Sequence, residues 1–162
     1  WGGVMEMYTE SALLKHAEEN FRDIFATAGK KEQGIILGII TEHRVATNRN
    51  AEITDKAGSD LKEKGAAYKL LRDVLLEVKR CGVLKNGQYL RWSNINSKKS
   101  LCDYMILIDG VNDIEYQVPH DVVFNKMKIK SNEICTTKAN MKILSEYVVE
   151  RVWYDMVCKF SR

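Results

Sequence analysis

The chain has 162 residues, of which 45% are hydrophobic, 9% are aromatic and 29% are charged. This composition is close to the globular average and excludes intrinsic disorder, because it provides enough apolar surface to offset the chain entropy lost on folding. No apolar run approaches the ~18 residues that a transmembrane helix requires, so we expect no membrane partner. The length predicts a single domain over residues 1–162.

The formal net charge of +3 is unevenly distributed along the chain. Residues 56–100 have 11 basic and 4 acidic side chains, a net charge of +7, whereas residues 1–55 have a net charge of −3. Residues 101–121 have 5 acidic side chains and no Lys or Arg, and residues 122–162 return to +4. A middle segment this basic can neutralise phosphate groups, which indicates nucleic acid as a partner.

The four cysteines, Cys81, Cys102, Cys135 and Cys158, are widely spaced. They form no CxxC pair and have no histidine at zinc-finger spacing, so they do not predict a zinc site. We expect reduced and mostly buried thiols in a cytoplasmic or nuclear protein, not a secreted one.

Three segments in the first half of the chain have helical periodicity. Residues 10–27 predict an amphipathic helix, which Thr9 or Ser11 can cap. The apolar run at residues 35–40 fits either a buried strand or a helix. Residues 66–81 predict the clearest helix, with six apolar side chains on one face and basic side chains opposite.

The second half of the chain alternates turns and short strands before a final helix. An Asn-Gly pair within residues 83–92 predicts a hairpin, because a type I′ turn needs positive φ at both central residues. A second turn separates predicted strands at 102–108 and 114–118, and residues 138–160 predict a helix. These elements predict an α+β fold in which the first and last helices pack on a small antiparallel sheet.

The order of elements over residues 32–92 resembles the winged helix-turn-helix family of DNA-binding domains. In this resemblance the helices and the wing are, in order, residues 32–43, 51–61, 66–81 and 83–92, and residues 93–162 add a hairpin and the C-terminal helix. The resemblance implies that the third helix enters the major groove and that the wing contacts the backbone. The basic residues expected to contact nucleic acid here and in the following polar loop are Lys62, Lys64, Lys69, Arg72, Lys85, Arg91, Lys98 and Lys99.

A second pattern resembles the PD-(D/E)XK nuclease family. Asp60 is followed by the triplet Glu77-Val78-Lys79. The resemblance implies that Asp60 and Glu77 lie on adjacent strands and hold Mg²⁺, while Lys79 orients the attacking water. If residues 66–81 are helical, however, Glu77 and Lys79 point about 200° apart and cannot share one metal site.

The helical periodicity of residues 66–81 therefore decides between the two resemblances, and six apolar residues at helical spacing favour the helix. We predict a nucleic-acid-binding protein, for DNA rather than RNA, centred on residues 62–99 and without a cofactor. A Mg²⁺-dependent nuclease that uses Asp60, Glu77 and Lys79 is the alternative. A protein-interaction module that docks a partner through the acidic hairpin at 101–121 is the second alternative.

Overall fold

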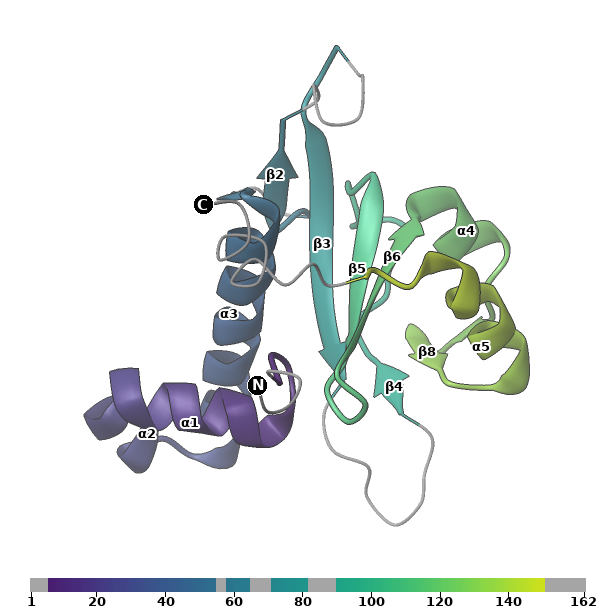
Figure 1. Ribbon diagram of the computed structural model, residues 1–162. Helices are drawn as coiled ribbons and strands as arrows, with labels where there is room; N and C mark the ends of the chain where they lie inside the picture. Colours follow the sequence, from purple (N-terminus) through teal and green to yellow (C-terminus); the bar gives the residue numbers. More distant parts are fainter. Residues whose placement is uncertain (1–5, 55–57, 65–70, 82–89, 151–162) are drawn as a thin grey trace, which may run out of the picture.

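The computed structural model describes residues 6–54, 58–64, 71–81 and 90–150. Figure 1 shows α3 beside a central sheet, with α1 and α2 at one end of α3 and with α4 and α5 beyond the opposite edge of the sheet. The helices are α1 (Glu10–Asn20), α2 (Arg22–Thr27), α3 (Lys30–Arg49), α4 (His120–Asn125), α5 (Lys138–Leu144) and the 3-10 helix η2 (Ser145–Tyr147). The strands are β1 (Glu52–Ile53), β2 (Leu61–Glu63), β3 (Val74–Cys81), β4 (Arg91–Trp92), β5 (Tyr104–Asp109), β6 (Ile114–Pro119), β7 (Ile129–Lys130) and β8 (Glu133–Cys135). These elements confirm the predicted α+β class.

Five strands form the central sheet in the order β1-β2-β3-β5-β6. β3 and β5 are parallel and the other neighbouring strands are antiparallel, so the sheet is mixed and the predicted antiparallel sheet is wrong in this respect. A smaller sheet has the order β4-β8-β7. β3 is therefore the middle strand of the larger sheet, with a hydrogen-bonded neighbour on each side.

β3 occupies a segment for which the sequence predicts a helix, so the predicted helix over 66–81 is wrong for its described second half, 74–81. Val74 and Leu76 are fully buried in a cluster with Val45 of α3. Because β2 and β5 satisfy the backbone hydrogen bonds and α3 covers one face, tertiary pairing overrides the helical spacing of the apolar residues.

The winged-helix arrangement predicted over residues 32–92 is wrong, because two of its three helices are absent from the described residues. The predicted first helix lies within α3, but β1 and β2 lie where the second helix, 51–61, is expected. The third helix is replaced by β3 over its described part, and residues 82–89, which contain the Asn-Gly turn of the wing, lie outside the described residues. The end of the expected wing, β4, pairs with β8 of the smaller sheet.

Two predicted helices are shorter than expected. The helix predicted over 10–27 is interrupted at Phe21, whose φ of −133° is not helical, and it becomes α1 and α2. In the helix predicted over 138–160, residues 138–147 form α5 and η2, Val148 is extended and forms a bridge with Tyr116 of β6, and residues 151–160 lie outside the described residues. The backbone at residues 148–149 thus pairs with the edge strand β6 instead of continuing a helix.

The acidic hairpin and its turn are confirmed. β5 and β6 pair antiparallel around the turn that follows Asp109, and Pro119 ends β6 directly before α4. Trp92 is fully buried in a core cluster that contains residues of both sheets. Its Nε1–H donates to the Ile108 carbonyl at 2.9 Å. This core fixes the smaller sheet against the central one.

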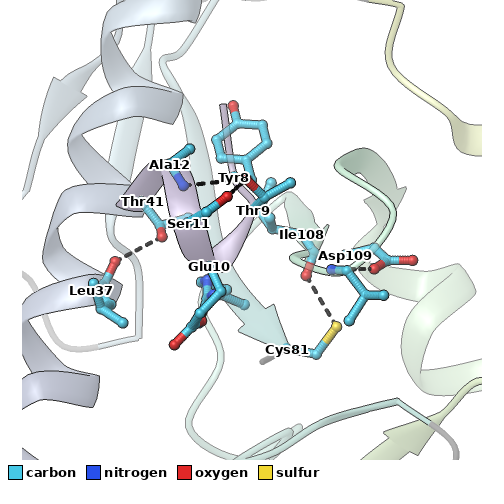
Figure 2. A network of polar contacts seen from close by, with 12 residues as sticks. Tyr8, Thr9, Glu10, Ser11, Ala12, Leu37, Thr41, Cys81, Ile108 and Asp109 are labelled. Carbon is cyan, nitrogen blue, oxygen red and sulfur yellow. Dashed lines mark hydrogen bonds and ion pairs between the residues drawn. The ribbon is translucent and has the colours of Figure 1, made fainter. Parts of the chain in front are cut away.

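Figure 2 shows separate polar contacts at the start of α1, within α3, and in the β3–β5 region of the sheet. The Thr9 hydroxyl accepts from the Ala12 N–H at 3.3 Å and confirms the predicted cap of α1. On α3, the Thr41 hydroxyl donates to the Leu37 carbonyl at 2.7 Å, so this buried hydroxyl is satisfied within the helix. No helix within the described residues is long and apolar enough to cross a bilayer.

The described cysteines agree with the expected thiols. Cys81, Cys102 and Cys135 are free, and the first two are buried. Burial raises the pKa of Cys81 and of Cys102 to about 11, which keeps both thiols protonated at neutral pH. Cys158 lies outside the described residues.

Candidate active site

Asp60, Glu77 and Lys79 meet at the β2–β3 side of the central sheet. Glu77 and Lys79 are two residues apart on β3, so a strand places both side chains on the same face, unlike a helix. The Lys79 Nζ lies 3.4 Å from the Glu77 Oε1. The objection that these side chains point in opposite directions is therefore wrong, because residues 74–81 are a strand.

Asp60 is held in place by both its backbone and its side chain. Its backbone N–H donates to the Leu76 carbonyl at 2.8 Å, and its Oδ2 accepts from the Val78 N–H at 2.7 Å. These bonds fix the carboxylate against the segment of β3 that contains Glu77. Burial raises the pKa of Asp60, the Val78 hydrogen bond opposes this rise, and the Glu77 charge adds to it.

Glu77 is positioned by the segment that leads into β5. The Ser100 hydroxyl donates to Glu77 Oε2 at 2.9 Å, and the Cys102 Sγ lies 3.8 Å from the same oxygen. The Ser100 hydroxyl is also 3.1 Å from the Cys102 Sγ, so the two side chains form one buried polar contact. With Lys79 on its other oxygen, Glu77 has both carboxylate oxygens engaged, which restricts its rotamers.

Glu42 of α3 is a carboxyl group close enough to Asp60 to be affected by its charge, and the sequence analysis did not single it out. Burial raises the pKa of Glu42 to about 7, and the Asp60 charge adds to the rise. The available signal was an acidic residue directly after the apolar run of α3, on a helix whose adjacent residues Thr41 and Val45 are fully buried. α3 packs on the face of β3 that holds Val74 and Leu76, so Glu42 influences Asp60 from the side of the sheet opposite to Glu77 and Lys79.

A polar groove of about 620 Å³ opens beside Glu77 and Lys79. Its lining comes from the segment before β2, from the middle of β3, from the loop between β4 and β5, and from the β7–β8 turn. The lining residues are Gly58, Glu77, Lys79, Asn94, Asn96, Lys98, Lys99, Ser100, Leu101 and Asn132. The groove therefore combines carboxylate, ammonium and amide groups, which suits a charged and hydrogen-bonding ligand better than an apolar one.

The predicted nucleic-acid contacts divide between this groove and other parts of the surface. Lys98 and Lys99 line the groove and are exposed. Lys64 is exposed at the end of β2, and the structure does not bring it into the groove. Lys69 and Lys85 lie outside the described residues.

Three other predicted contacts are paired with acidic residues. Lys62 lies 3.2 Å from Glu52, Arg72 forms two hydrogen bonds with Asp103 at 2.6 and 2.9 Å, and Arg91 lies 3.4 Å from Glu133. The Arg72 guanidinium holds the pKa of Asp103 below its usual value. Ion pairing reduces the charge that these residues can offer to phosphate, so the structure does not gather the predicted set into one surface.

The acidic hairpin at 101–121 uses most of its carboxylates internally. Asp109 accepts from the Asn112 backbone and side chain, and Asp113 accepts from the Tyr8 N–H at 2.8 Å. Glu115 accepts from the Tyr8 hydroxyl and pairs with Arg49 at 3.3 Å. With Asp103 paired as well, the hairpin keeps little free acidic surface for a docking partner.

The donor set of the site fits a cation that takes few protein ligands. Among the described residues, no three His, Cys, Asp or Glu side chains gather closely enough to hold a metal ion together. Mg²⁺ is commonly bound by one or two carboxylates and keeps several waters, so the Asp60 and Glu77 carboxylates are a suitable pair. A structural zinc site with four protein ligands does not fit.

Comparison with known proteins finds a partial similarity to a solved structure. No family model matches the sequence, and no curated protein matches it. Among solved structures, the chain is similar to the bacterial homing endonuclease I-Ssp6803I, with a TM-score of 0.49 and 14% sequence identity over 82% of this chain and 94% of that chain. A similarity at this identity concerns the course of the chain and not its side chains.

Proposed function

We propose that the chain is a Mg²⁺-dependent endonuclease that hydrolyses phosphodiester bonds in DNA. The observation that carries the proposal is that Glu77 and Lys79 lie on one face of β3 and line a polar groove, while Asp60, directly before β2, is bound to the Val78 N–H between them. Two fixed carboxylates and a lysine are the groups that metal-assisted phosphodiester hydrolysis needs. A helix would turn Glu77 and Lys79 away from each other, which was the reason for preferring a binding protein without activity. Because residues 74–81 form a strand, that reason no longer applies.

Each residue has a role that follows from its position. Asp60 and Glu77 would hold Mg²⁺, which supplies Lewis-acid polarisation of the phosphate and of a bound water when present. Lys79 would orient the attacking water and offset the negative charge that develops on the phosphate. Hydrolysis forms a bond between the water oxygen and phosphorus and breaks a phosphorus–oxygen ester bond. The proton that the attacking water loses passes to the solvent in the groove, and the leaving oxygen takes up a proton from solvent.

The groove supports DNA as the substrate. Lys98 and Lys99 lie on the same groove as Glu77 and Lys79, so phosphates bound by the first pair would lead the strand toward the second. The amides of the groove add hydrogen-bonding groups without further negative charge. Nucleic-acid binding without cleavage remains the second candidate, favoured by these two exposed lysines alone.

The test is nicking of supercoiled plasmid by the full chain with Mg²⁺ and with EDTA. We expect cleavage with Mg²⁺ alone, and a loss of at least about a hundredfold in each of Asp60→Asn, Glu77→Gln and Lys79→Ala. Asp121→Asn and Lys126→Ala alter exposed residues of the α4 region and should cleave like the wild type. DNA binding that persists without cleavage under any of these conditions would instead support the binding-only candidate.

A further inference from the structure

Two asparagines of the groove have side chains that the fold does not use. Asn94 and Asn132 are exposed and line the groove with Glu77 and Lys79. Within the described part of the chain, neither side-chain amide has a hydrogen-bond partner. Asn96 differs, because its Oδ1 accepts from the Lys98 N–H at 3.0 Å and so shapes its own turn.

The backbones that present these amides are fixed. Asn94 and Asn132 have φ values of 59° and 58°, in the left-handed region that Asn tolerates better than most residues. The Ile95 N–H donates to the Asn132 carbonyl at 2.8 Å, which ties the two turns together. Ile95 is 1% exposed, so its buried side chain anchors this junction. The turns explain why a residue that tolerates positive φ is present, but glycine would serve the backbone equally well.

We propose that Asn94 and Asn132 read bases of the DNA next to the cleaved phosphate. A side-chain amide has one donor and one acceptor side, which match the N6 and N7 groups of adenine in the major groove. Lys98 and Lys99 bind phosphate and set the register, while the two amides select sequence. The proposal rests on the proposed nuclease function and adds adenine selectivity to it.

The experiment uses the full chain and a pool of DNA duplexes with a randomised segment. Cleaved products formed with Mg²⁺ are sequenced for the wild type, Asn94→Gly, Asn132→Gly and the double variant. Glycine keeps the left-handed backbone and removes the amide. Asn50→Gly is the matched control, because Asn50 has a φ of 53° at the end of α3 and lies outside the groove. Thermal unfolding confirms that each variant is folded.

We expect the wild type to favour adenine at one or two positions near the cut, with about a tenfold loss of that preference in each groove variant. Base preference is compared at equal extents of cleavage, because the lost contacts also weaken DNA binding, and Asn50→Gly should keep both the preference and the cleavage rate. Cleavage by the groove variants with an unchanged preference overturns the base-reading role and leaves the nuclease intact. If the wild type cleaves nothing, the nuclease proposal fails and the bound fraction of the pool is sequenced. Adenine enrichment that both variants lose then supports base reading, and its absence overturns it.

Discussion

Glu42→Gln should make the protein more stable at high pH while leaving its stability at low pH unchanged. The pKa of Glu42 rises from 4.5 to about 7 in the folded protein, so the folded chain holds this proton to a higher pH than the unfolded chain. Below pH 4.5 Glu42 is protonated in both the folded and the unfolded chain, and it does not lower the free energy of unfolding. As the pH rises from 4.5 to about 7, the unfolded chain loses this proton first, so the free energy of unfolding falls. Glutamine has the same shape and cannot ionise, so it escapes the loss.

The size of the effect follows from the same shift. Each pH unit between the folded and unfolded pKa is worth about 1.4 kcal/mol, which sets a ceiling of about 3 kcal/mol for Glu42. The side chain is partly exposed, and solvent screening reduces the expected difference to about 1–2 kcal/mol. At pH 8, the free energy of unfolding of Glu42→Gln should exceed that of the wild type by this amount, whereas at pH 4.5 the two proteins should have the same free energy of unfolding.

The assay is urea unfolding of both proteins between pH 4.5 and pH 8 in EDTA, so that no divalent cation neutralises the carboxylates. Glu18→Gln is the control, because it makes the same substitution at an exposed residue of α1. Parallel stability curves for the wild type and Glu42→Gln would refute the reasoning, since they would show that Glu42 ionises as easily in the folded protein as in the unfolded chain.

Two further changes test the framework of the site. Gly58→Ala should destabilise the protein by about 2 kcal/mol and weaken DNA cleavage, because Gly58 has a φ of +86° and a Cβ there would lie 2.3 Å from the Lys99 carbonyl oxygen. Wild-type urea stability in Gly58→Ala would contradict this close approach. Trp92→Phe should cost about 1–3 kcal/mol in urea unfolding, because it leaves a cavity in the core and removes the hydrogen bond to Ile108. A smaller loss would show that the two sheets repack around phenylalanine.

Several features followed from the sequence because their causes are local. The cap at Thr9 and the turn after Asp109 depend on residues within a few positions, whose side chains or backbone conformations select the structure. The β5–β6 hairpin followed from alternation on either side of that turn. The spacing of Asp60, Glu77 and Lys79 was likewise visible in the sequence as a pattern.

Only the tertiary structure decided whether that pattern forms a site. The apolar residues between 66 and 81 suit a helix by their spacing, and no local feature shows that β2 and β5 pair with both edges of 74–81. Those pairings turn Glu77 and Lys79 to one face, and the packing of α3 brings the charge of Glu42 within reach of Asp60. Contacts between residues far apart in the chain carry no local signature, because they depend on which surfaces become buried together. The sequence alone therefore indicated Asp60, Glu77 and Lys79 as candidate groups, and long-range pairing placed them together.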